Sequence, residues 1–251
     1  MVLLGFVDLD PGLAALRPLG GFFVLPTRGA PHRPLPTLAQ TYEIESSDIC
    51  RNSMTFRVEK VANTLRAPEP RIAASVAQQG LAARLWSVAL GCAALYGRIP
   101  DLDPHLLHWD PDGSAPDDLW LPEVRPLPAD AGTVAAVVVH GHLEPLAEAL
   151  RARYRVAAGL LWGNAGSALA GAARQLDHWA RANGRTDVAA LARSLTAELF
   201  GHPRLTATGT LTGTAFRRRS CCLYYRVPGG GLCGDCCFTR PPRSSPHAAS
   251  G

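Results

Sequence analysis

The sequence predicts an α+β fold that is mostly α-helical, with a short β-sheet and a C-terminal segment rich in cysteine. Long stretches of alanine and leucine repeat their apolar residues at helical spacing, while only one short run is rich in β-branched residues. Five of the seven cysteines fall between residues 217 and 238. A chain of 251 residues can bury a sizeable core without disulfide bonds, so this crowding indicates metal or redox chemistry.

The first part of the chain carries few signals of regular structure. Residues 1–37 contain many prolines and glycines and no sustained period, so we expect an irregular segment. The opening MVLLGF is too short for the apolar part of a secretory signal, and acidic residues follow it at once. We therefore expect a cytoplasmic protein with reduced thiols. Residues 38–205 should form a mainly helical core, beginning with one helix or two short ones over 38–66.

Four stretches of the core have helical patterns. Residues 71–97 follow Pro70 and carry apolar residues three to five positions apart, which predicts a largely apolar helix ending near Gly97. Gly80 is a point where this helix could break. The other helical stretches are 143–154, 157–182 and 186–200.

Strands are expected at two places between these helices. The sequence DLWLP lies in the proline- and aspartate-rich region 100–131 and predicts a short strand. TVAAVVVH, residues 133–140, is rich in β-branched residues and is the best strand candidate.

The stretch 156–173 has no charge over eighteen residues, which is near the lower limit for crossing a bilayer. It consists mostly of alanine and glycine, so a buried helix is favoured over a membrane span.

Positive charge is concentrated at the C-terminal end. The whole chain carries +4, whereas residues 217–251 contain six arginines and one acid, Asp235, a balance of 6 − 1 = +5. The first 216 residues therefore carry 4 − 5 = −1. Three consecutive arginines could contact nucleic acid, but no helix-turn-helix or zinc-finger spacing accompanies them, so we expect no nucleic-acid partner.

The cysteines of this basic segment have the spacing of metal ligands. RRRSCCLYYRVPGGGLCGDCCF, residues 217–238, contains the pattern C-C-x10-C-x2-C. A C-x2-C turn can bring two sulfurs to one metal. Adjacent Cys221 and Cys222 would point to opposite sides of an extended strand, which suits a two-iron cluster better than one zinc ion. Structural zinc, disulfides and unligated thiols are the alternatives.

These residues also resemble a known family. FRRRSCCLYYRVPGGGLCGDC closely resembles the C-terminal signature of FhuF-type ferric-siderophore reductases, and the resemblance extends upstream through AASVAQQGLAARLWSVALGCAALYG and LLWGNAGSALAGAA. It implies that the segment 206–238 binds a [2Fe–2S] cluster. Cys237 is an extra thiol that could replace the fourth ligand, and residues 239–251 are expected to be disordered. The ligands that the resemblance implies are Cys221, Cys222, Cys233 and Cys236.

The resemblance also implies an activity. It indicates an oxidoreductase that transfers one electron to a ferric siderophore and releases Fe(II) in the cytoplasm. An external donor, such as a ferredoxin or a flavin reductase, would supply the electrons, and any membrane association would be peripheral, at the inner face. Two other functions stay open: a [2Fe–2S] electron carrier with no siderophore substrate of its own, and an interaction module stapled by zinc.

Other candidate residues have weaker patterns. His140 and His142 could ligate a metal, but no partner ligands are evident, so a role in a loop or helix start is favoured. DPHLLHWDPDG, residues 103–113, does not fit the calcium pattern and predicts a polar surface turn. The tryptophans could line a siderophore pocket, but Trp86 and Trp162 lie in apolar helical sequence, which favours the core.

Overall fold

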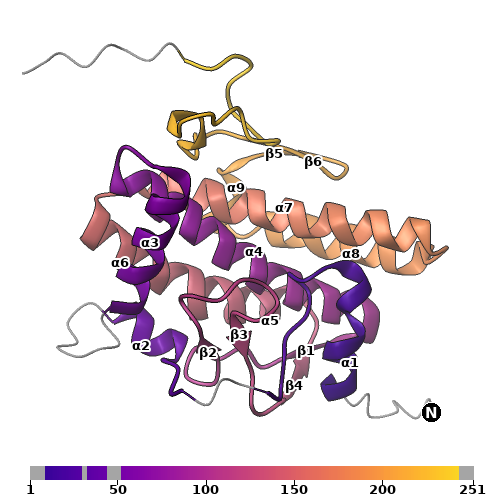
Figure 1. Cartoon of the computed structure of the whole chain (residues 1–251). Helices are drawn as coiled ribbons and strands as arrows, with labels where there is room; N and C mark the ends of the chain where they lie inside the picture. The colour runs from indigo at the N-terminus through magenta and orange to yellow at the C-terminus, as the bar shows by residue number, and fades with distance from the viewer. Residues whose placement is uncertain (1–8, 30–32, 44–51, 243–251) are drawn as a thin grey trace, which may run out of the picture.

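The computed structural model of the protein describes residues 9–29, 33–43 and 52–242 (Figure 1). The helices are α1 (Leu9–Ala15), η1 (Arg17–Leu19), α2 (Leu38–Tyr42), α3 (Asn52–Leu65), α4 (Pro70–Tyr96), α5 (Ala131–Ala135), η3 (Ala136–Leu143), α6 (Glu144–Tyr154), α7 (Ala158–Ala182), α8 (Thr186–Phe200), α9 (Pro203–Thr206) and η4 (Tyr224–Arg226). The strands are β1 (Arg98–Pro100), β2 (His108–Trp109), β3 (Leu119–Trp120), β4 (Pro126–Pro128), β5 (Gly209–Thr212) and β6 (Ala215–Arg218). The predicted mostly helical α+β fold is confirmed.

Helix α4 forms the centre of the core. It is apolar on nearly every side because other elements cover it all round, α7 and α3 most extensively. Pro70 stands in its first turn, where the missing N–H costs nothing, and Gly97 ends it in the left-handed conformation at φ +65°. The helix continues without a break through Gly80, so the alternative of a break there is wrong.

Helix α7 lies against α4 on one side and α8 on another. Its charge-free half is buried among these helices, which confirms the expectation of a buried helix over residues 156–173. In the described part of the chain, every helix is too short or too polar to span a bilayer. Figure 1 shows the β5–β6 hairpin and the C-terminal segment on the outer side of α7, the side that faces away from β1–β4.

The strands pair into three small antiparallel sheets, β1 with β4, β2 with β3, and β5 with β6. The strand predicted at DLWLP is confirmed as β3. In the third sheet Gly209 pairs with Arg218, and β6 alternates between exposed and buried residues. Phe216 and Arg218 therefore both face the core, although one is apolar and the other charged.

The strand predicted over 133–140 is wrong, because this run is helical. Asp130 caps α5 by accepting hydrogen bonds from the backbone N–H and hydroxyl of Thr133, at 2.9 and 2.7 Å. The helix then widens into the π-helical turn η3. Val134 and Val138 lie four residues apart and are both fully buried, so packing against the core overrides the β propensity of the valines.

The N-terminal segment is also more ordered than its composition predicts. Within 1–37, expected to be irregular, α1 and η1 place Leu13 and Leu16 in the core. The fully buried side chain of Arg84 on α4 donates to the carbonyl of Phe22 at 2.5 Å and to that of Gly21 at 3.2 Å. The segment is thus fixed against α4. Residues 1–8, whose signal character the sequence argued against, lie outside the described residues.

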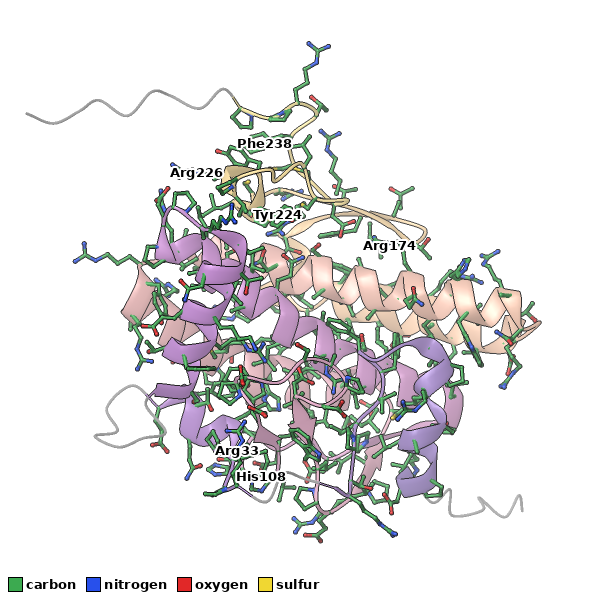
Figure 2. The ribbon with its side chains drawn as sticks, viewed as in Figure 1. Arg33, His108, Arg174, Tyr224, Arg226 and Phe238 are labelled. Carbon is green, nitrogen blue, oxygen red and sulfur yellow. The ribbon has the colours of Figure 1, made fainter. Side chains whose placement is uncertain are left out.

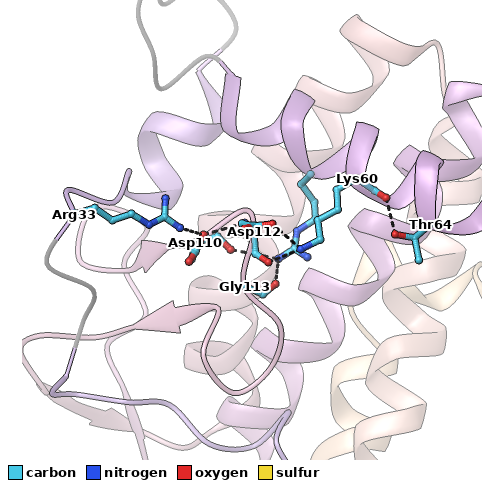
Figure 3. Close-up of polar contacts among 7 residues, drawn as sticks. Arg33, Lys60, Thr64, Asp110, Asp112 and Gly113 are labelled. Atoms are coloured by element: carbon cyan, nitrogen blue, oxygen red, sulfur yellow. Dashed lines mark hydrogen bonds and ion pairs between the residues drawn. The ribbon is translucent and has the colours of Figure 1, made fainter.

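The aspartate-rich loop after β2 is held by basic side chains (Figure 3). Asp110 pairs with Arg33 at 2.5 Å, and Asp112 with Lys60 at 2.6 Å. Arg57 donates to the carbonyl of Gly113 at 2.7 Å. These pairs hold the loop in place. The predicted polar surface turn is only partly confirmed, because Leu107, Trp109 and Asp110 are buried and Trp109 lies in β2.

Candidate functional site

The cysteine-rich segment is a closed loop on the outer side of α7. It begins at the end of β6 and returns to it, because the backbone N–H of Arg218 donates to the carbonyl of Asp235 at 2.9 Å. A tight turn joins the last cysteines, with Cys236 N–H bonded to the carbonyl of Cys233 at 3.1 Å. The start and the end of the cysteine pattern are therefore brought together, as metal ligation requires.

Two of the four predicted ligands are in direct contact. The Sγ atoms of Cys222 and Cys233 lie 3.6 Å apart. Two sulfurs bound tetrahedrally to one metal at about 2.3 Å lie about 3.8 Å from each other, so this pair has the spacing of two ligands on one iron. No group of three or more histidine, cysteine, aspartate or glutamate side chains among the described residues is arranged around a single ion. A two-iron cluster needs ligand pairs of this kind instead of four sulfurs around one point.

The other cysteines lie in the same loop. Cys221, Cys236 and Cys237 are half-buried. The backbone N–H of Leu223 donates to Cys221 Sγ at 3.2 Å, and that of Phe238 donates to Cys236 Sγ at 3.4 Å. Both thiols thus lie in turns where an amide points at the sulfur, and such N–H groups stabilise negative charge on a cluster's sulfurs.

The contact pair also favours a thiolate. The pKa of the Cys222 thiol is lowered to about 6, chiefly by its hydrogen bond with Cys233 and in part by the positive charge of Arg218. The same hydrogen bond raises the pKa of Cys233. Burial raises the pKa of Cys221 to about 11. The hydrogen bond between the two sulfurs therefore favours the thiolate form at Cys222 over Cys233, and the thiolate is the form that binds metal.

Arg218 is the most unusual side chain of the site. It is 2 % exposed, and its Nη2 donates to Asn164 Oδ1 at 2.5 Å and to the Leu160 carbonyl at 3.3 Å. Its Nε and Nη1 are buried without a partner, as is the hydroxyl of neighbouring Ser220. Among the described residues no carboxylate lies within ion-pair distance of Arg218. A buried cation without an anion is costly.

The unpaired donors fit an anionic cluster. A [2Fe–2S] centre held by four thiolates carries a net charge of about −2 when oxidised, with sulfur atoms that accept hydrogen bonds. The Nε and Nη1 groups of Arg218 would supply both the opposite charge and the donors. The residues present therefore fit the group on two counts, the pair of sulfurs and the buried cation.

The loop is tied to the core by a short polar chain. Ser75 on α4 donates its hydroxyl to the carbonyl of Cys222 at 2.8 Å. Asn164 on α7 donates to the carbonyl and hydroxyl of Ser75, at 2.9 and 3.0 Å, while accepting from Arg218. All of these side chains are buried. Both long helices thus contribute directly to the position of Cys222.

Family comparison decides the assignment. A family model described as "Ferric iron reductase FhuF-like transporter" matches residues 78–213, more than half of the chain, and one described as "FhuF 2Fe-2S C-terminal domain" matches residues 218–238. The chain belongs to the FhuF-like family. The family is one of ferric iron reductases, and the C-terminal domain of this FhuF-like protein binds a [2Fe–2S] cluster. No curated protein matches the chain.

Of the remaining candidates, His140 and His142 lie inside η3, instead of in a loop or at a helix start as expected. His142 is buried between the Tyr42 hydroxyl, at 2.9 Å, and the Leu102 carbonyl, and burial lowers its pKa to about 4. Exposed His140 pairs with Glu144 at 2.9 Å. Trp86 is fully buried, which confirms the core interpretation. Trp162 is partly buried, and a guanidinium lies 5.3 Å from its ring centre.

Close packing between α7 and the hairpin sets the position of the loop. A Cβ at Gly166 would lie 2.5 Å from the hydroxyl of buried Thr208 and 3.2 Å from the ring of Phe216. We expect Gly166→Leu to destabilise the protein by roughly 1–3 kcal/mol through overpacking, and to lower the iron bound per chain. Thermal unfolding and iron analysis measure both effects.

A second glycine of the same helix serves as the control. A Cβ at Gly159 would meet no atom within 4 Å, so Gly159→Leu adds the same side chain without a clash. It should keep the parent's iron content and unfolding temperature. Equal behaviour of the Gly159 and Gly166 variants would contradict the idea that close contact with α7 positions the loop.

Proposed function

We propose that this protein is a ferric-siderophore reductase that transfers one electron to the bound Fe(III) and releases Fe(II) in the cytoplasm. The observation that carries the proposal is the contact pair Cys222 and Cys233 beside the unpaired donors of Arg218. This arrangement supports a cluster whose negative charge is balanced by buried Arg218. The other side of the loop lies at the protein surface.

The chemistry needs no acid–base pair. Siderophores bind Fe(III) through hard oxygen ligands, and these ligands hold Fe(II) far more weakly. When bound, the cluster supplies the single electron that converts one state to the other. The chain's own residues bind and orient the complex, keep the loop in place and balance charge. An external ferredoxin or flavin reductase then returns an electron to the protein.

The proposed cluster ligands are Cys221, Cys222, Cys233 and Cys236. The contact between Cys222 and Cys233 supports their binding to one iron. Cys221 and Cys236 would then hold the second iron, and each receives a backbone N–H on its sulfur. We prefer Cys236 to Cys237 because its N–H closes the turn with Cys233 and its sulfur accepts the Phe238 amide.

The outer face of the loop suits an acidic electron donor. Of the arginines in the basic segment, Arg226 is neutralised by Glu69 at 2.7 Å and Arg218 is buried. Among the described residues of this segment, Arg217, Arg219 and Arg240 are exposed and carry the positive field. Figure 2 shows Phe238 on the side of the loop that faces away from the helices, where it is 37 % exposed. Exposed charge beside an aromatic residue is typical of a transient docking surface.

Single-turnover reduction tests the function. Protein reduced with dithionite and freed of excess reductant is mixed anaerobically with ferric siderophores of the hydroxamate, catecholate and carboxylate classes. We expect about one Fe(II) per cluster, trapped by a ferrous chelator as the visible spectrum of the oxidised cluster returns. Failure to reduce every complex, with fast electron transfer to a ferredoxin, would favour the electron-carrier alternative. Zinc without iron in the purified protein would favour the zinc-stapled module.

A further inference from the structure

A cavity of about 520 Å³ opens beside the cysteine loop. Its walls come from four separate parts of the chain: the N-terminal segment 19–23, α4, α7, and the turn Cys233–Asp235. This volume lies within the range of pockets that bind small molecules. It adjoins a proposed cluster ligand, since Cys233 forms part of the wall.

The walls of the cavity are fixed in place. Buried Arg84 bonds to Asp118 at 2.8 Å and to the carbonyls of Gly21 and Phe22, which anchors the N-terminal wall to α4. Gln175 on α7 donates to the Leu19 carbonyl at 3.4 Å and joins the same wall to α7. A binding site therefore exists without a large rearrangement, which lowers the entropic cost of binding.

The floor beside Cys233 is polar but balanced in charge. Buried Asp235 accepts a hydrogen bond from Ser167 at 2.6 Å and pairs with Arg174 at 3.0 Å. Arg174 extends from α7 toward the β5–β6 hairpin (Figure 2) and donates to the Thr214 carbonyl at 3.4 Å. The walls also offer the amide of Gln79 and the apolar ring of Phe22, which is 44 % exposed. Amides, a hydroxyl and an aromatic ring are suited to the mixed polar and apolar surface of a chelated metal.

We propose that this cavity is the docking site of the ferric complex. A complex held there lies against Cys233, whereas Arg217, Arg219 and Arg240 do not line the cavity. The substrate and the proposed electron donor then use different parts of the surface and do not compete. The inference rests on the proposed function, because it places that reaction's substrate.

Filling the cavity tests the proposal. A Cβ at Gly171 would meet only the end of Arg174, at 3.9 Å, so Gly171→Leu projects a side chain from α7 into the cavity without strain in the helix. The matched control is Gly80→Leu on α4. A Cβ at Gly80 meets no atom within 4 Å, and Gly80 lines a different cavity. Gln79→Trp fills the first cavity from its other helix and gives a second, independent variant.

The binding probes are the gallium(III) complexes of a trihydroxamate and of a tricatecholate, which cannot be reduced by one electron in water. Titration calorimetry on the cluster-loaded protein measures their affinity. We expect at least one complex to bind, Gly171→Leu and Gln79→Trp to weaken it tenfold or more, and Gly80→Leu to match the parent. The KM for the ferric form should rise by the same factor, while the visible spectrum stays unchanged.

The outcomes separate the two proposals. Parent-like binding in both Gly171→Leu and Gln79→Trp overturns the cavity as the docking site, even when ferric complexes are reduced. Equal weakening in Gly80→Leu overturns it as well. Gallium binding that depends on the cavity, combined with no reduction of any ferric complex, keeps the binding site and overturns the reductase function.

Discussion

Cys222→Ser is expected to remove the visible absorption of the [2Fe–2S] cluster, and Cys233→Ser is expected to do the same. Their sulfurs form the contact pair at 3.6 Å, so either substitution leaves one iron with a single thiolate from the protein. Iron and acid-labile sulfide in anaerobically purified protein should fall to near zero. Far-UV circular dichroism should stay close to the parent, because the helical core lies outside the loop.

Cys237→Ser is the matched control for these variants. It changes a half-buried thiol of the same loop that we do not propose as a ligand, so it should keep the parent's colour and iron content. Loss of colour in Cys237→Ser with full colour in Cys236→Ser would move the fourth ligand to Cys237. Full colour in Cys222→Ser would contradict the contact pair as a ligand pair.

Arg218→Gln is expected to lower the reduction potential of the cluster. The buried guanidinium has no carboxylate partner in the described structure, and reduction adds a negative charge beside it. Removing the cation therefore disfavours the reduced state. A hydrogen bond to a charged group contributes roughly 1.5–3 kcal/mol. For a one-electron couple 1.4 kcal/mol corresponds to about 59 mV, so the potential should fall by about 60 mV or more.

Two further arginine variants distinguish an electrostatic from a structural role. Arg218→Lys keeps the charge and should recover much of the potential, although a lysine cannot donate to Asn164 and the cluster in the same way. Arg219→Gln removes the exposed neighbouring charge and should shift the potential little, because solvent screens it. Redox titration followed by electron paramagnetic resonance gives all three values. Equal potentials in the Arg218→Gln and Arg219→Gln variants would refute a charge-balancing role for Arg218.

The sequence predicted the parts of the fold that local pattern controls. The helices over 71–97, 157–182 and 186–200 follow from their apolar spacing and are confirmed within a residue or two. The run 133–140 was misassigned because β-branched composition describes a local preference, whereas the packing of Val134 and Val138 is a tertiary effect. Similarly, the buried leucines of α1 could not be recognised among so many prolines and glycines.

The cofactor of the candidate site was predictable from the sequence, but the surroundings of the cysteines were not. The cysteine spacing and the resemblance pointed to the metal chemistry, whereas the three consecutive arginines were treated together as one basic run and Arg218 was not singled out. The alternation of β6 held a signal that could have corrected this, since a strand that buries Phe216 also buries Arg218. The cavity had no such signal, because segments 19–23 and 233–235 meet only in the folded chain.

The bonds from Ser75 and Asn164 bear on how the protein matures. They hold the Cys222 carbonyl and the Arg218 side chain by groups that need no inorganic partner. A zinc finger folds only around its ion. In this protein, by contrast, the loop should already hold its cysteines in place before the cluster is inserted. After oxidative loss of the cluster, the protein would keep the conformation of its binding loop. A new cluster would then be inserted into the same chain, without synthesis of a new protein.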